Sequence, residues 1–179
     1  MLRAPAGDNA KSARDRAIVG LLLGCGLRRA ELVRLQVEDI QQRAGRWVIP
    51  DLMGKGNRLR TVPVPAWVKL LVDQWLTAAG IEAGPLFRPV NKAGAIGAAG
   101  LTENAVWWIV REYAGALELG KLSPRDLRRT CAQLCRASGG ALEQIQLLLG
   151  HQSIQTTMNY LGVRLDLVQA VNDRLGVAS

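Results

Sequence analysis

Long apolar stretches are missing from this chain of 179 residues. A membrane-spanning helix needs roughly 20 consecutive apolar residues, but the longest uninterrupted run covers only residues 17–23 and contains Gly20. Residues 1–11 also lack the basic start and the apolar middle of a secretory signal. We therefore expect a cytoplasmic protein that forms a single domain of ordinary size and does not enter a membrane.

Cysteine is also scarce, with only Cys25, Cys131 and Cys135 in the chain. An odd number of cysteines cannot close a complete set of internal disulfides, and no two of them have the two-residue gap of a zinc knuckle. Cys131 and Cys135 lie one helical turn apart among apolar neighbours, as small buried side chains often do. The cysteine pattern therefore predicts no metal site.

Positive charge, in contrast, is abundant: 23 Lys and Arg residues face 15 Asp and Glu residues, and the net charge is +8. Of the 23 basic residues 18 are arginines, which make bidentate contacts to phosphate that lysine cannot reproduce. The surplus lies in two blocks, residues 1–61 and 121–136. If the blocks fold together they would face a polyanion, so the charge pattern favours a nucleic-acid-binding protein over one with merely solvated arginines.

The spacing of apolar residues predicts a mainly α-helical fold with a small antiparallel β-sheet, an α+β fold. A flexible tail is expected over residues 1–10. Two strands are expected at 46–49 and 58–64 around a glycine-containing turn, with Arg58 and Arg60 on one face and Leu59 on the other. Helices are expected at 11–24, 28–37, 68–79, 102–119, 123–138, 142–149, 153–160 and 164–175, with a Gly- and Ala-rich loop over 80–100.

Four short motifs gather residues that can act on a phosphate ester. They are Gly26-Leu27-Arg28-Arg29-Ala30-Glu31-Leu32, Gly54-Lys55-Gly56 with Arg58 and Arg60, Ser123-Pro124-Arg125-Asp126-Leu127-Arg128-Arg129-Thr130, and Leu149-Gly150-His151 followed by Tyr160. Each motif alone has a structural explanation, such as a surface arginine, a solvated hairpin lysine, a helix-capping histidine or a half-buried phenol. The combination of all four motifs, in this order and at this spacing, is more specific than any one of them.

Taken together, the motifs resemble the catalytic domain of the tyrosine recombinases, the phage integrase family. The resemblance extends over residues 11–179, and its last motif includes Thr156-Thr157-Met158-Asn159-Tyr160. It implies the mainly helical fold with a small sheet that is typical of this domain. The N-terminal core-binding domain that these enzymes use to clamp the duplex is expected to be absent, because only a short segment precedes the first helix.

The resemblance implies that Tyr160 attacks a DNA phosphodiester and forms a 3′-phosphotyrosyl intermediate, after which strand exchange and religation need no metal, ATP or other cofactor. Arg28 and Arg128 would clamp the charged phosphoryl group and lower the pKa of the phenol. Lys55 matches the general acid, and His151, the only histidine in the chain, matches a further donor to the phosphate.

Other residues are assigned supporting roles. Glu31 is expected either to orient an arginine or to be a plain surface carboxylate. The residues expected to contact DNA directly are Arg29, Arg58, Arg60 and Arg129.

Arg125 departs from the family pattern, because the family usually has a histidine three residues before the second arginine. Arg125 shares a helix face with Arg128 and can still point at phosphate, but it cannot accept a proton. Arg129 also replaces a frequent histidine and is expected to face away from Arg128. Two alternatives to a recombinase therefore stay open: a catalytically weakened or inactive DNA-binding module, and type IB topoisomerase-like nicking and religation.

The partners that the resemblance implies are double-stranded DNA and further copies of the chain, as a tetramer on paired DNA sites or a monomer in isolation. The setting would be the nucleoid of a bacterial-type cytoplasm. The expected helix at 164–175 would dock either on a neighbouring protomer or on its own domain, and the loop at 91–100 is a second candidate for partner contacts.

Overall fold

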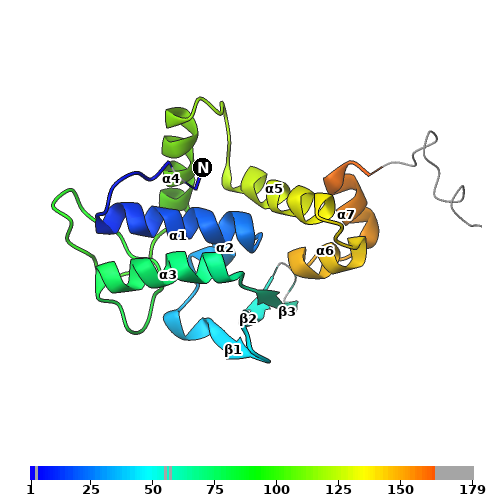
Figure 1. Ribbon diagram of the computed structural model, residues 1–179, viewed down its shortest axis with the longest axis horizontal. Helices are drawn as coiled ribbons and strands as arrows, with labels where there is room; N and C mark the ends of the chain where they lie inside the picture. The colour runs from blue at the N-terminus through cyan, green and yellow to red at the C-terminus, as the bar shows by residue number, and fades with distance from the viewer. Residues whose placement is uncertain (3, 55, 57, 164–179) are drawn as a thin grey trace, which may run out of the picture.

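The computed structural model describes residues 1–2, 4–54, 56 and 58–163. Over these residues it confirms a mainly helical fold with a small antiparallel sheet (Figure 1). The elements are α1 (Ala10–Gly24), α2 (Arg29–Leu32), a 3-10 turn (Val37–Asp39), β1 (Gln41–Arg43), β2 (Arg46–Met53), β3 (Leu59–Pro63), α3 (Ala66–Ala79), α4 (Glu103–Ala116), α5 (Pro124–Ala137), α6 (Leu142–Leu149) and α7 (Ile154–Leu161).

Helix α1 is the centre of the main core and packs against α3, α4 and α5. Its apolar side chains, among them Ile18 and Leu22, are fully buried together with Trp75 of α3. Glycine lets α1 and α3 approach closely: a Cβ added at Gly24 would lie 2.5 Å from a methyl carbon of Val68. The two helices therefore lie side by side (Figure 1).

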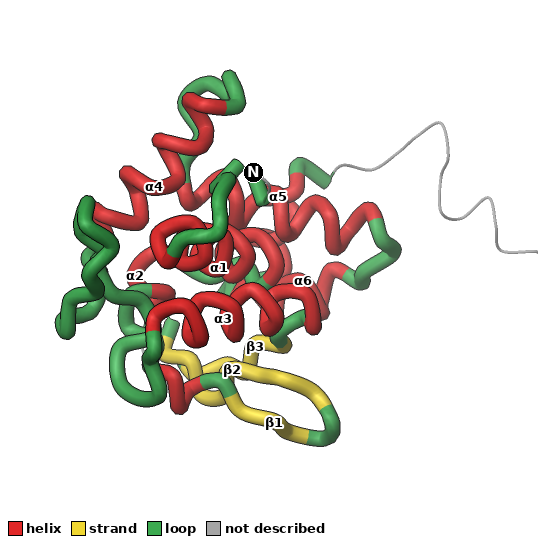
Figure 2. The backbone as a smooth tube through the Cα atoms, turned by 60° about the vertical axis from the view of Figure 1, so that its left-hand side comes forward, coloured by secondary structure: helices red, strands yellow, loops and turns green. Residues whose placement is uncertain are grey.

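The sheet has the order β1-β2-β3, with antiparallel neighbours, at one edge of the molecule (Figure 2). Strand β1 was not expected from the sequence, which has no apolar alternation over its three exposed residues. The alternation in β3 is as expected, and the structure shows which face is buried: Leu59 is 58% exposed, whereas Arg60 points inward on the same side as buried Val62.

Helix α2 is much shorter than the sequence predicts, because the expected helix over 28–37 ends after one turn. The backbone beyond this turn bonds to a distant loop instead: the amide of Val37 donates to the carbonyl of Gly84, and the amide of Leu86 donates to the carbonyl of Leu35. Tertiary pairing with the segment before α4 thus replaces the helical hydrogen bonds.

The N-terminal residues, expected as a flexible tail, lie against α1. Met1 and Leu2 pack on the main core, Arg16 donates to the carbonyls of Pro5 and Gly7 at 2.8 and 2.9 Å, and Ser12 donates to the carbonyl of Ala6. The expected helix at 164–175 lies outside the described residues. Within the described part, no helix has the length and apolar character that crossing a membrane requires.

Helices α5, α6 and α7 form a second, smaller cluster that packs on α1 and on β3 (Figure 1). The predicted start of α5 is confirmed, since Asp126 accepts hydrogen bonds from the amide and hydroxyl of Ser123. Helix α6 ends at Gly150 in the left-handed conformation, with φ of 61°. This sharp end turns the chain so that the residue after it, His151, faces α5 and α7.

Candidate active site

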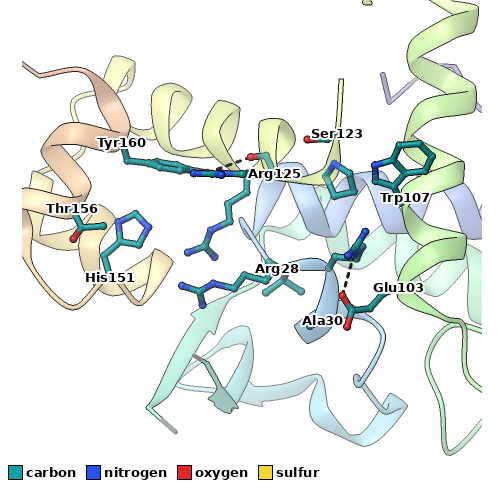
Figure 3. A pocket seen from close by; sticks show the side chains of 13 residues that line it. Arg28, Ala30, Glu103, Trp107, Ser123, Arg125, His151, Thr156 and Tyr160 are labelled. Carbon is teal, nitrogen blue, oxygen red and sulfur yellow. Dashed lines mark hydrogen bonds and ion pairs between the residues drawn. The ribbon is translucent and has the colours of Figure 1, made fainter. Parts of the chain in front are cut away.

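A cavity of about 740 Å³ lies between α2, α4, α5 and α7. Its walls carry five of the six residues that the sequence predicts to be catalytic: Arg28, Arg125, Arg128, His151 and Tyr160. In Figure 3, Tyr160 and His151 lie next to each other and Arg28 extends toward them. The sixth, Lys55, falls outside the described residues, so its position relative to this cavity stays a prediction.

Arg128 of α5 is the most deeply buried of these cations. Its Nη1 and Nη2 donate to the carbonyls of Gly26 and Leu149, which hold the guanidinium against the ends of α1 and α6. Burial, and next the nearby charge of Arg28, lower the pKa of Arg128 to about 10. The group therefore keeps its positive charge at neutral pH, and its orientation is set by the fold.

Arg28 occupies the N-cap position of α2 and is held by Glu31. Its Nη1 donates to Oε1 of Glu31 at 2.7 Å, and its backbone amide donates to Oε2 of the same carboxylate at 2.7 Å. The side chain remains 30% exposed at the cavity. One carboxylate thus fixes both the backbone and the side chain of the first predicted arginine.

Glu31 also binds Arg60, at 2.8 and 2.9 Å through both carboxylate oxygens. Burial raises the pKa of Glu31, but the hydrogen bonds from Arg60 and Arg28 outweigh burial and leave that pKa below its ordinary value. Glu31 is therefore a buried carboxylate that orients arginines, and the alternative of a plain surface carboxylate is wrong. The expected contact of Arg60 with DNA is also not supported, because its side chain is only 8% exposed and is used inside the protein.

Tyr160 of α7 is half-buried, and its hydroxyl donates to the backbone carbonyl of Arg125 at 3.3 Å. Burial raises the pKa of the phenol above 10.0, and the positive charges of Arg128, Arg125 and Arg129 offset this only in part. Arg128 thus lowers the pKa of Tyr160 as expected, but burial outweighs this effect and the net pKa lies above the ordinary value; Arg28 is not among the groups that shift it. Desolvation of the phenolate costs more than the nearby guanidinium groups recover.

His151 packs its ring edge-on against that of Tyr160, with 5.2 Å between the ring centroids. Its Nδ1 lies 3.0 Å from Oγ1 of Thr157. Burial lowers the pKa of His151 to about 4, and the charges of Arg128, Arg28 and Arg60 act in the same direction. The imidazole is consequently neutral at neutral pH.

Of the remaining predicted residues, two lie at the cavity and two lie elsewhere. Arg125 is exposed at its rim, and Arg29 lines it while forming an ion pair with Glu103 at 3.0 Å. Arg58 is exposed beside the hairpin turn. Arg129 is exposed and lines a separate cavity on the other side of α5, as expected of a residue that faces away from Arg128.

Three residues of the site were not predicted from the sequence. Glu103 and Trp107 reach the cavity from α4, and Glu103 pairs there with Arg29, which is far away along the chain. Thr157 belongs to a recognised motif, but its buried contact with His151 depends on how α7 packs. In the described part of the chain, no group of three His, Cys, Asp or Glu side chains could hold a metal ion.

The sequence of this chain is similar to that of proteins of one known family. The model of the phage integrase family matches residues 1–165. Tyrosine recombinase XerC of Pseudomonas aeruginosa is 34% identical over 171 residues, which cover 93% of this chain and 53% of that protein. Tyrosine recombinase XerC of Vibrio campbellii is 34% identical over 158 residues, which cover 86% of this chain and 48% of that protein.

Solved structures show the same fold. The XerH site-specific recombinase bound to a difH substrate, in a pre-cleavage complex, has a TM-score of 0.74 at 24% identity, and the match covers 93% of this chain and 48% of that chain. The XerA recombinase has a TM-score of 0.72 at 23% identity, over 91% of this chain and 55% of that chain. The fold expected from the resemblance is thereby confirmed, and the chain spans about half the length of the curated relatives it matches.

Proposed function

This chain belongs to the phage integrase family of tyrosine recombinases, and from that premise we propose that it is the catalytic domain of a site-specific DNA recombinase. One observation supports the proposal above all others. Arg28, Arg128, His151 and Tyr160 lie on separate elements, yet their side chains line one cavity. This cavity combines two guanidinium groups, an imidazole and a phenol. Such a set of side chains is better explained by attack on a phosphodiester than by a role in holding the fold together.

In the proposed reaction, Oη of Tyr160 attacks the phosphorus of a DNA phosphodiester and loses its proton. The bond between phosphorus and the 5′ oxygen breaks, the departing oxygen takes up a proton, and a 3′-phosphotyrosyl link is left. A 5′-hydroxyl of another strand then attacks this link, which restores the phosphodiester and the free tyrosine. Each step exchanges one phosphate ester for another, so no energy-rich cofactor is required.

The arginines would stabilise the negative charge that gathers on the non-bridging oxygens in the transition state. Arg128 suits this role because two backbone carbonyls already fix its guanidinium. Arg28 suits it because Glu31 holds the side chain at the cavity while leaving it partly exposed. Donors that are fixed before the substrate arrives need no reorganisation during the reaction, which is the main advantage of such a site.

We expect the phenol of Tyr160, the proposed nucleophile, to carry its proton at neutral pH. The pKa of Tyr160 lies above its ordinary value, so the phenol is protonated at neutral pH, and its hydroxyl donates to the carbonyl of Arg125 at 3.3 Å. For the proposed attack on phosphorus, the phenol would have to lose both its proton and this hydrogen bond.

Lys55 is proposed as the general acid on the strength of the resemblance and of its place in the Gly54-Lys55-Gly56 motif of the sequence. Substitution Lys55→Ala should stop cleavage of ordinary DNA and allow cleavage of a substrate whose 5′ leaving group needs no proton. If the second substrate is not cleaved either, Lys55 has another role.

The decisive experiment uses a duplex nicked close to the cleavage site, from which the short 5′ strand diffuses away. We expect a protein–DNA adduct that survives denaturation and is absent from the variant Tyr160→Phe. Binding should weaken strongly as salt increases, because phosphate contacts dominate it. Salt-dependent binding without any adduct would instead support the inactive DNA-binding module that Arg125, in place of the family histidine, leaves open.

A further inference from the structure

Thr157 is a fully buried polar side chain that the proposed reaction does not use. It lies on α7, one turn before Tyr160, with its hydroxyl turned toward the ring of His151. The 3.0 Å between its Oγ1 and Nδ1 of His151 is a normal hydrogen-bond length. The geometry alone does not say which of the two atoms donates, and that choice decides what the other ring nitrogen can do.

The surroundings of Thr157 settle the direction of this bond. Helical threonines commonly donate to a carbonyl in the preceding turn, as Thr130 of α5 does to the carbonyl of Asp126 at 2.9 Å. Thr157 makes no such bond, and among the described residues Nδ1 of His151 is the only hydrogen-bond partner of its hydroxyl. If Nδ1 carried the proton, the hydroxyl hydrogen would be buried without an acceptor, which is unfavourable. The hydroxyl therefore donates to Nδ1.

A neutral imidazole carries one proton, so a ring that accepts at Nδ1 must carry its proton on Nε2. His151 lines the cavity beside Tyr160, with Arg28 extending toward the same space (Figure 3). A protonated Nε2 is a donor, and donors are what an anionic phosphate oxygen requires. The opposite tautomer would present a lone pair to the phosphate and repel it.

We propose that Thr157 is a positioning residue that donates its hydroxyl proton to Nδ1 of His151 and thereby holds the only histidine of the chain as the Nε2–H tautomer, a donor to a phosphate oxygen. The tautomer itself depends on the described contacts alone. Its catalytic consequence rests on the proposed function, so the two parts are tested separately.

The tautomer can be read by nuclear magnetic resonance because the chain contains a single histidine. Protein without a polyhistidine tag, labelled with ¹⁵N-histidine, gives one pair of ring nitrogen resonances at neutral pH. We expect Nδ1 in the range of an unprotonated nitrogen and Nε2 in the range of a protonated one. In Thr157→Val the Nδ1 resonance should move toward that of a nitrogen without a hydrogen bond, and in Thr157→Ser it should stay.

The matched control for this measurement is Thr77→Val, which removes an exposed threonine hydroxyl from α3 and should leave the spectrum unchanged. A proton on Nδ1 in the wild-type protein would overturn the proposal. So would ring resonances that do not respond to Thr157→Val. A thermal unfolding curve of each variant shows whether the fold is retained.

The catalytic part is tested with the nicked duplex. We expect Thr157→Val to slow adduct formation by about 10- to 100-fold without weakening DNA binding, because it disturbs one donor to the transition state. Thr157→Ser keeps the hydroxyl and should stay near the wild-type rate. In a His151→Gln background, Thr157→Val should have no further effect. An equal loss in both backgrounds would show that Thr157 acts only through packing. If the wild-type protein forms no adduct, the proposed function fails, while the resonances still decide the tautomer.

Discussion

Arg60 ties Glu31 to the end of helix α6. Its guanidinium binds both oxygens of the carboxylate at 2.8 and 2.9 Å, and its Nε donates to the carbonyl of Leu148 at 3.0 Å. Glu31 also binds Arg28, and His151 directly follows the end of α6. Arg60 therefore joins the carboxylate that holds Arg28 to the helix end that positions His151. We interpret Arg60 as a structural link within the site.

Removing this link should destabilise the protein. Arg60→Ala leaves the buried carboxylate of Glu31 with Arg28 as its remaining cationic partner, and breaking a buried ion pair typically costs about 3 kcal/mol. We expect a loss of that size in the free energy of unfolding measured with urea. Arg60→Lys should recover only part of it, because an ammonium cannot reproduce the two parallel hydrogen bonds. A stability equal to wild type in Arg60→Ala would contradict this interpretation.

The close approach of α1 and α3 gives a prediction with an internal control. In Gly24→Ala the new methyl group would meet Val68 and Trp67 at 2.5 to 2.9 Å, so the helices must separate. We expect a loss of about 1–3 kcal/mol in the free energy of unfolding.

The control is Gly115→Ala in α4, where an added Cβ meets nothing within 4 Å. The same substitution should there stabilise the protein by about 0.5–1 kcal/mol, because alanine is the better helix former. Equal effects at the two positions would show that packing between α1 and α3 is not the cause.

What the sequence could predict was local. The start of α5 at Ser123 and the end of α6 at Gly150 follow from capping chemistry within a few residues, and both are confirmed. The early end of α2 could not be predicted, because it depends on hydrogen bonds between the segments 35–37 and 84–86. Distant pairing of this kind leaves no periodic signal in either segment.

The same limit applies to the site. Motif spacing predicted which residues would gather, and five of the six catalytic candidates line one cavity. It could not predict their environment. Alternation in β3 predicted that Arg60 and Leu59 lie on opposite faces, but it could not predict which of the two faces the interior. The raised pKa of Tyr160 results from burial in the folded protein, which could not be predicted from the number of arginines in the motifs.

The lowered pKa of His151 links the stability of the protein to pH. The unfolded chain binds a proton at the ordinary pKa of 6.5, whereas the folded protein binds it only near 4. Between these values the unfolded state holds more protons, so stability falls as the pH decreases from 6.5 to about 4. Urea unfolding across this window should show a smaller loss in His151→Gln than in the wild-type protein. Identical pH profiles would mean that His151 titrates normally.

Loss of an arginine of the proposed phosphate clamp should affect chemistry more than binding. We expect Arg28→Ala to slow adduct formation on the nicked duplex by at least about 100-fold, the usual effect of removing one transition-state donor. Arg43→Ala is the matched control, since Arg43 is an exposed arginine on β1. Equal rates for the two variants would remove Arg28 from the proposed clamp.

The proposed reaction gives a last prediction for Arg125, which departs from the family pattern expected from the sequence. It lies at the rim of the cavity, its carbonyl accepts the hydrogen bond of the Tyr160 hydroxyl, and its guanidinium cannot take a proton from the attacking phenol. Arg125→His keeps the backbone carbonyl and restores a side chain that can exchange protons near neutral pH. We expect adduct formation on the nicked duplex to equal or exceed that of the wild-type protein, with the largest gain near neutral pH, where the phenol is otherwise protonated. A clear loss of activity would instead show that the positive charge of Arg125 is itself used to bind the phosphate, and would make this arginine a functional replacement for the family histidine.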